Sequence, residues 1–415
     1  MYLRRKALLA VLAVVIFLLL LFAFYGYNQT WQLWNIPVMS PAFADLRVIT
    51  HGADAVAMGM DPLINNPGDP WGRPLNYPRI WQSLYSIGIN KSHTVGLGVG
   101  IILCFLAGVV MVLPNVSNKT IALVIGALVS PAILLGVERG NIDLFIFFLA
   151  ALTIVWARKS AAAGVMLIVF GTLLKLFPIF SVPVLLRLEK RKFILYAVII
   201  LAISLIYFFV IWSELLLISS ATPRATDLSY GINVAWMHVE EINTSLGQFL
   251  QFIAMLLVFI AACLSLFACT QRSSLNTTSQ IEESVALDSF RLGACIYIGT
   301  FLLGNNWDYR LLFLIFTIPQ LSLWMASSSK QLRWCSAIAL LTMLISMWYL
   351  VILKFWFALA SGLFYSIPVT QLLPFIIDES SNWVLFLLLT YLFSIALPDW
   401  AKAMLLSPLR AYARR

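Results

Sequence analysis

Residues 7–27 read ALLAVLAVVIFLLLLFAFYGY and contain no charged side chain. An apolar run of this length matches the roughly 20 residues that a helix needs to cross the hydrocarbon core of a bilayer. Arg4, Arg5 and Lys6 precede the run, as basic residues precede a signal peptide, but the run is longer than a signal-peptide core and no small-residue cleavage site follows it. The stretch is therefore predicted to be a retained first transmembrane helix.

The rest of the chain has the same character. It is 415 residues long, 61% hydrophobic and 11% charged, against roughly 25% charged in a typical soluble domain. Lipid must solvate much of this surface, and in lipid only helices or closed barrels satisfy their own backbone groups. The apolar runs have helix lengths and do not alternate as barrel strands do. We expect one all-α transmembrane bundle over residues 1–415, with about 12 helices at 7–27, 94–113, 120–136, 142–157, 161–175, 176–187, 193–212, 246–268, 291–304, 311–326, 334–353 and 383–400.

The charges between these runs predict the orientation of the bundle. With the N-terminus in the cytoplasm, most of the 27 basic residues and a minority of the 18 acidic residues fall on the cytoplasmic side. Both termini are then cytoplasmic and residues 28–93 form the first extracytoplasmic loop. The other long connections are 213–245, 269–290 and 354–382. Residues 271–290 are polar and predict a cytoplasmic linker, whereas 355–377 are apolar but broken by prolines and are expected to lie along the membrane or dip into it.

The stretch 161–187 decides the orientation downstream, because one long helix would turn most later basic residues outward. Lys175 lies in its middle and Pro178 and Pro183 follow. A proline and a buried cation are typical of a broken span, so two short pieces that meet near Lys175 are predicted. An ammonium at that depth needs an anion from elsewhere in the chain or from a ligand, or it must extend to the membrane surface.

Several function classes find no support in the sequence. The net charge of +9 follows membrane topology, so it does not indicate nucleic-acid binding. The five cysteines lie in or beside apolar runs without metal-ligand spacing, which predicts no disulfide and no zinc site. The glycines of 96–100 lie inside an apolar run, where tight helix packing explains them better than a nucleotide. No cofactor or metal is expected.

Candidate site residues gather in the segments predicted to face outward. In the first loop Asp45 and His51 stand out, whereas Asp61 and Asp69 precede prolines, as turn residues do. Asp45 also fits an exposed helix start. Three further clusters, each at the outer end of predicted spans, are GVERGNIDLF (136–145), HVEEINTSLGQF (238–249) and GNNWDYRLLF (304–313). Their charged residues either face a cavity or pair with each other, the aromatic residues of the last fit a membrane belt, and Asn243 to Ser245 fit a helix cap.

Four groups of residues, in this order, resemble the GT-C class of membrane glycosyltransferases, most closely the bacterial polyprenyl-phosphate-mannose-dependent α-mannosyltransferases. They are FADLRVITHGADAVAMGMDPL (43–63) with NYPRIW (76–81), ERGNIDLFIFFLAAL (138–152), GTLLKLFPIFSVPVLLRLEKRK (171–192), and NTSLGQFL (243–250) with NNWDYRLLF (305–313). The resemblance covers about residues 40 to 315. The family commonly has Gln where Arg139 stands and His where Asp308 stands.

This resemblance implies a bacterial inner-membrane enzyme with an extracytoplasmic site and a polyprenyl-phosphate sugar donor, mannose or a related hexose. The acceptor would be a lipid or glycan, and the other partners are membrane lipids. Asp45 matches the family's catalytic aspartate and would act as the general base of an inverting transfer. The donor phosphate would be bound by Arg139, Lys175, Arg310 and Arg79. Sugar or acceptor contacts are expected from His51, Asn141, Asp308, Trp307 and Asn243.

Two other readings stay open. A flippase for lipid-linked sugars, or a small-molecule transporter, would also combine buried cations with many spans. Transporters often contain inverted repeats with broken helices in both halves, whereas one break and no matching halves are found here. The third reading is an inactive scaffold of an envelope assembly.

Overall fold

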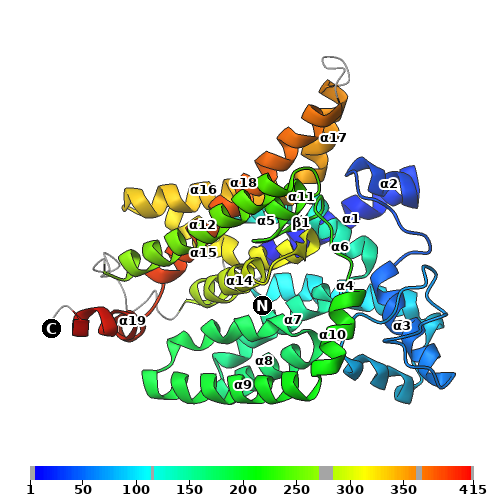
Figure 1. Cartoon of the computed structure of the whole chain (residues 1–415), viewed down its shortest axis with the longest axis horizontal. Coiled ribbons are helices and arrows are strands. Elements are labelled where there is room, and N and C mark those ends of the chain that lie inside the picture. Colours follow the sequence, from blue (N-terminus) through cyan, green and yellow to red (C-terminus); the bar gives the residue numbers. More distant parts are fainter. Residues whose placement is uncertain (1–4, 114–115, 271–283, 361–366, 413–415) are drawn as a thin grey trace.

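Helices account for 79% of the chain in the computed structural model, which describes residues 5–113, 116–270, 284–360 and 367–412 (Figure 1). Within these residues the strands are limited to β1 (Ser229–Tyr230) and β2 (Asn306–Trp307), which pair antiparallel, Ser229 with Trp307 and Tyr230 with Asn306. The prediction of an all-α fold is confirmed.

The first half of the chain contains α1 (Arg5–Tyr25), α2 (Tyr27–Leu33), α3 (Ala44–Ala57), η2 (Arg79–Ile87), η3 (Lys91–His93), α4 (Thr94–Met111), α5 (Asn118–Leu128), α6 (Pro131–Arg139), α7 (Asp143–Ala157), α8 (Ala161–Lys175) and η4 (Phe177–Arg187). The second half contains α9 (Lys190–Val210), α10 (Trp212–Ala221), α11 (Val234–Glu240), α12 (Thr244–Thr270), α14 (Val285–Leu302), η5 (Asp308–Thr317), α15 (Ile318–Met325), α16 (Lys330–Met347), α17 (Tyr349–Ala360), α18 (Ile367–Ile395) and α19 (Asp399–Tyr412). Elements named η are 3₁₀-helices.

Six helical segments in the described residues are long and apolar enough to cross a membrane: Arg5–Tyr25, Lys91–Met111, Lys190–Val210, Thr244–Thr270, Val285–Leu302 and Leu372–Ile395. Two bent pairs, α5 with α6 (51°) and α16 with α17 (67°), raise the number to eight if each pair is one span. The chain therefore has the helices of a membrane protein, but twelve separate spans are not confirmed. Three of the predicted spans correspond to the shorter apolar elements α7, α8 and η4.

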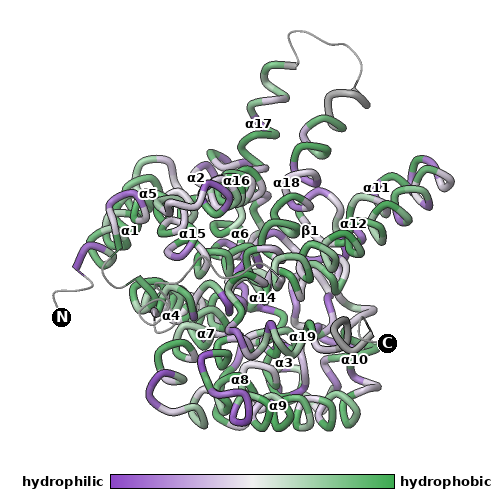
Figure 2. The backbone as a smooth tube through the Cα atoms, turned by 90° about the vertical axis from the view of Figure 1, so that its left-hand side faces the viewer, coloured by the Kyte–Doolittle hydropathy of each residue, from purple (hydrophilic) through white to green (hydrophobic). Residues whose placement is uncertain are grey.

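The surface of the long helices fits contact with lipid. In Figure 2, α9 and α12 are hydrophobic along most of their length. Large apolar side chains project from both, including Phe209, which is 83% exposed, and Phe259, which is 65% exposed. Exposure of apolar surfaces of this extent is unfavourable in water, whereas contact with lipid tails is not.

The predicted break near Lys175 is confirmed. Helix α8 ends at Lys175, Leu176 departs from helical geometry (φ 7°, ψ −51°), and the chain continues as η4. Pro178 removes a backbone donor at the start of η4 and Pro183 removes another inside it, so an α-helix cannot continue.

Several predicted boundaries are wrong. Residues 383–395 of the span placed at 383–400 are the end of α18, which begins at Ile367, and the described part of the connection 354–382 is helical. The connection 269–290 ends early, because α14 starts at Val285. The rest of the expected linker, 271–283, lies outside the described residues, as do positions 361–366 of the stretch 355–377.

Helix α7 lies in the core and sets the position of the site. Phe147 stacks on Phe316 with ring centroids 4.2 Å apart, and it meets Phe105 edge to face at 5.0 Å. These contacts fix α7 between α4 and η5. Since α7 and α8 pack against each other in antiparallel order, the first residue of α7, Asp143, lies beside the last residue of α8, Lys175.

Candidate functional site

The start of α3 is fixed by a partly buried phenylalanine. Phe43 precedes the helix in a left-handed conformation (φ 63°), and its backbone N–H donates to the Glu138 carbonyl at 3.3 Å. Its ring lies so close to Gly98 and Gly140 that an added Cβ would fall 2.6 and 2.9 Å away. Gly98 therefore has the packing role predicted for it, and the contact holds Asp45, in the first turn of α3, against the end of α6.

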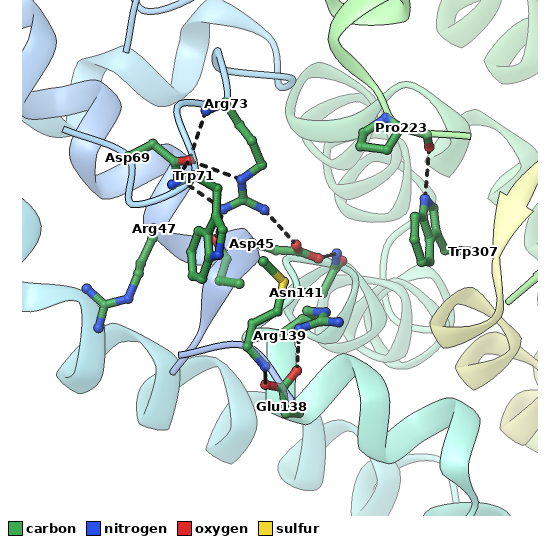
Figure 3. Close-up of polar contacts among 12 residues, drawn as sticks. Asp45, Arg47, Asp69, Trp71, Arg73, Glu138, Arg139, Asn141, Pro223 and Trp307 are labelled. Carbon is green, nitrogen blue, oxygen red and sulfur yellow. Dashed lines mark hydrogen bonds and ion pairs between the residues drawn. The ribbon is translucent and has the colours of Figure 1, made fainter. Parts of the chain in front are cut away.

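Asp45 is contacted from two sides (Figure 3). The Asn141 side-chain amide donates to Asp45 Oδ2 at 2.6 Å, and Arg73 lies 3.7 Å from Asp45 Oδ1. Arg73 is itself held by Asp69 at 3.0 Å, whereas Arg47 points away and donates to the Ala42 carbonyl. The Asp45 side chain is 20% exposed, so it is not fully enclosed by these partners.

The surroundings of Asp45 make it a stronger base than a free aspartate. Burial raises the pKa of the Asp45 carboxyl above its ordinary value of 3.8. The hydrogen bond from Asn141 and the charges of Arg139, Arg73 and Lys175 act in the opposite direction, and burial outweighs them. A raised pKa moves a carboxylate toward the value that suits general base catalysis near neutral pH.

A continuous polar chain connects Asp45 to two largely buried cations. The other side-chain atom of Asn141, Oδ1, accepts from Lys175 Nζ at 3.3 Å. Lys175 Nζ lies 2.8 Å from Asp143 Oδ1, and Arg310 Nε lies 3.2 Å from Asp143 Oδ2. Arg310 also donates to the Asn306 side chain. Of the anions expected for Lys175, the structure therefore provides one from within the chain, Asp143.

Lys175 and Arg310 border a cavity of about 450 Å³. Its walls combine apolar and polar side chains from the segment before η2, the α8–η4 break, α10, the loop before β1, α11, the segment between α14 and β2, β2 itself and η5: Asn76, Tyr77, Pro78, Lys175, Leu176, Phe177, Leu215, Ile218, Ser219, Thr222, Pro223, Arg224, Asn233, Met237, Leu303, Asn305, Asn306, Trp307, Tyr309 and Arg310. The described lining includes three cations and no carboxylate. Neither Asp45 nor Asn141 is a lining residue, and Asp45 is connected to the cavity through Asn141 and then Lys175.

Two predicted phosphate ligands lie outside this cavity. Arg139 pairs with Glu138 at 2.9 Å and donates to the Pro37 carbonyl, which fits the expected alternative that charged residues of the cluster 136–145 pair with each other. Arg79 binds Asp61 at 2.6 Å and Glu214 at 3.1 Å, and so joins the segment 28–93 to α10. Both guanidinium groups are thus engaged by carboxylates of the chain.

Some of the residues predicted to contact the sugar or acceptor lie at the site, and others lie elsewhere. Asn141 and Trp307 belong to the site, and the Trp307 indole donates to the Pro223 carbonyl at 3.1 Å (Figure 3). Asn243 accepts from the Leu246 backbone at 3.0 Å and caps α12, as the alternative reading predicted. His51 is buried under Gly68, and neither ring nitrogen has a hydrogen-bond partner among the described residues. Burial lowers the pKa of the His51 imidazole.

Asp308 points to a different environment from Arg310. It is buried, and its Oδ1 has no hydrogen-bond partner in the described residues. Asp378 and Glu379 of α18 are also buried, and Asn382 donates to Asp378 Oδ1 at 3.3 Å. No set of three or more His, Cys, Asp or Glu residues in the described ranges is arranged to bind a metal ion.

Three site residues were not among those predicted. Asp143 opens an otherwise apolar helix, and a carboxylate in that position requires a cation, which is a signal that the sequence contains. The ring of Tyr77 lies 5.1 Å below Lys175 Nζ, a cation–π contact. Arg224 stands in a loop without periodicity, and nothing in the sequence distinguishes it from any exposed arginine.

Comparisons with protein-family models, with characterised proteins and with solved structures gave no match to this chain.

Proposed function

We propose that the chain is a membrane glycosyltransferase of the GT-C class that moves a hexose from a polyprenyl-phosphate donor to a lipid or glycan acceptor. The observation that carries the proposal is the pairing of a cavity lined by three cations and no described acid with a carboxylate, Asp45, two hydrogen bonds away. Such a cavity favours an anion, and a general base beside it suits attack by a hydroxyl group.

The lining of the cavity fits the three parts of such a donor. Lys175 and Arg310 would bind the phosphate. Leu176, Leu215 and Ile218 offer apolar contact for the first isoprene units. Trp307 and Tyr309, whose rings stack with centroids 6.2 Å apart, offer a flat surface to the sugar. In this proposal Arg139 influences Asp45 through its charge, and Arg79 stabilises the α10 wall.

The proposed reaction is a single displacement. The acceptor oxygen attacks the anomeric carbon and forms the new glycosidic bond, while its proton passes to Asp45 Oδ1 or Oδ2. The bond from the anomeric carbon to the phosphate oxygen breaks, and its electron pair stays on the polyprenyl phosphate. Phosphate is a good leaving group, so one carboxylate suffices, unlike the pair that glycoside hydrolysis usually requires. Lys175 and Arg310 stabilise the charge that develops on the phosphate.

Counted over the twelve predicted spans, the distribution of basic residues favours a cytoplasmic N-terminus, and the proposal places the site on the opposite face. For a bacterial enzyme this is the outer face of the inner membrane, where lipid-linked sugars would serve as donors.

Reconstitution tests the proposal directly. Purified protein in vesicles would receive radiolabelled polyprenyl-phosphate hexose and an extract of membrane lipids and glycans, and covalently labelled product is expected. Asp45→Asn should lower the rate by about 10²–10⁴-fold. The matched control is Asp54→Asn on the same helix, since Asp54 contacts the Lys91 backbone and lies outside the Asp45 network. Wild-type-like transfer by Asp45→Asn would remove Asp45 from the mechanism.

A lipid-linked-sugar flippase or small-molecule transporter is the second candidate. The observation that favours it is the burial of Asp378 and Glu379 within α18, since acids inside a span often mark ion or proton pathways. The same vesicles separate the two functions, because a transporter moves label across the membrane without a covalent product. Absence of both results would favour an inactive scaffold.

A further inference from the structure

Lys175 and Arg310, two cations that line the cavity, already share one carboxylate of the chain. Asp143, whose side chain is fully buried, contacts Lys175 at 2.8 Å and Arg310 at 3.2 Å. Two positive charges and one negative charge give the group of Lys175, Asp143 and Arg310 one net positive charge. Both cations are also oriented by amides, Lys175 by Asn141 and Arg310 by Asn306. The group formed by Lys175, Asp143 and Arg310 is therefore rigid, and its net positive charge is complementary to a monoanion.

Arg224 is the third cation of the lining and differs from the other two. Its neighbours in the chain are fixed: the Pro223 carbonyl accepts from the Trp307 indole at 3.1 Å, and the Ala225 carbonyl accepts from the Asn305 side chain at 2.6 Å. The Arg224 residue is exposed, and its guanidinium has no hydrogen bond or ion pair with another described residue. The backbone around Arg224 is therefore held beside the cavity, while its guanidinium charge is unpaired among the described residues.

The charge of the phosphate changes during the proposed reaction. A polyprenyl-phosphate sugar is a phosphodiester with one negative charge. The product is a phosphomonoester that approaches two negative charges above its second pKa of about 6. The net positive charge of the Lys175, Asp143 and Arg310 group compensates the single charge of the phosphodiester. It does not compensate the second charge of the phosphomonoester. An interaction that strengthens as charge develops accelerates the reaction, whereas equal binding of both states does not.

We propose that Arg224 binds the departing phosphate and supplies the charge that the reaction creates, so that the cavity discriminates a dianionic phosphomonoester from a monoanionic phosphodiester. This inference rests on the proposed glycosyl transfer. Arg224 contacts the leaving oxygens in this assignment, while Lys175 and Arg310 position the phosphate in donor and product alike.

A pair of soluble lipid phosphates tests the proposal by binding alone. Farnesyl phosphate is a monoester and its methyl ester is the matched diester. Dissociation constants would be measured at pH 8 with the full-length protein in nanodiscs. Wild type should prefer the monoester. Arg224→Gln should weaken monoester binding by about ten- to hundredfold and change methyl-ester binding by less than about threefold, while Arg224→Lys retains most of the preference.

The matched control is Arg333→Gln, which removes an exposed arginine outside the cavity and should change neither constant. Where transfer is measured, Arg224→Gln should lower kcat with little change in donor KM. Equal loss of both ligands, or no loss of either, overturns the role of Arg224 while the anion site stands. Failure of the wild type to bind either ligand would instead overturn the donor site itself, and with it the proposed function.

Discussion

Asp143 and Lys175 form an ion pair with 2.8 Å between Oδ1 and Nζ, and so join the first residue of α7 to the last residue of α8. The Asp143 side chain is fully buried and that of Lys175 is 14% exposed. The sequence indicates that each residue needs a charge of opposite sign but does not identify the partner. Together with Arg310 the pair sets much of the charge that the cavity presents.

Removal of this carboxylate should destabilise the fold. Asp143→Asn keeps the shape of the side chain but leaves Lys175 and Arg310 without their shared anion. The loss of one partner from a buried pair typically costs about 3–5 kcal/mol, so the unfolding temperature of the protein in detergent should fall clearly. Glu189→Gln serves as the control, because its pair with Lys192 is exposed and spans 4.0 Å. An Asp143→Asn protein that unfolds at the wild-type temperature would show that the pair has no structural role.

The pH dependence of transfer should report the Asp45 environment. The base must be deprotonated to act, so activity falls as pH drops through its pKa, which burial has raised above 3.8. The hydrogen bond from Asn141 lowers this pKa, so Asn141→Ala should move the acidic limb of the kcat/KM profile to higher pH. An unmoved limb in Asn141→Ala would assign that limb to another group.

Protonation of His51 should destabilise the segment between α1 and α4. Burial lowers its pKa in the folded state below 6.5, its value when exposed. The unfolded chain therefore binds the proton more readily, and stability falls as pH drops below 6.5, while above that value the two states carry the same charge. Unfolding temperatures between pH 5 and 7.5 should show this slope in wild type and a smaller slope in His51→Leu. Equal slopes in both proteins would contradict the assignment.

Gly231 should tolerate no side chain. Its φ is +136°, and an added Cβ would lie 1.8 Å from the Gly304 carbonyl oxygen, so Gly231→Ala must displace the loops that carry β1 and β2. Gly59→Ala is the matched control, because Gly59 also has positive φ (+73°) but nothing lies within 4 Å of the added atom. The control carries only backbone strain, about 1–2 kcal/mol. Limited proteolysis and the unfolding temperature should separate the two variants, and equal behaviour would show that the loops adapt.

Hydropathy predicts the parts of the fold that face lipid and fails where polar residues are buried by the protein itself. The break near Lys175 follows from one cation and two prolines, and it was predicted correctly. The start of α18 was placed too late because Asp378, Glu379 and Asn382 resemble a loop. In the folded chain Tyr297 donates to Asn382 and the helix continues through them. Hydropathy cannot detect a partner that is distant in sequence.

The same limit applies to the site. Asp45 and Asn141 were predicted among its residues, and the structure brings them into contact. Arg139 and Arg79 looked equivalent to Lys175 as cations near predicted span ends. Pairing of Arg139 with a charged residue of its own cluster was an expected alternative, and Glu138 is that partner. The partners of Arg79, Asp61 and Glu214, could be assigned only once the chain was folded.

Arg79 connects the segment before η2 to α10, and its side chain is 39% exposed. Ion pairs that solvent can reach weaken as dissolved salt increases, because mobile ions screen them over about 8–10 Å at moderate concentrations. The buried Asp143 pair is shielded from this effect. Higher ionic strength should therefore weaken the attachment of α10 at the cavity while the ion pairs of Asp143 with Lys175 and Arg310 persist. The width of the cavity opening can then change without a change in the charged groups inside it.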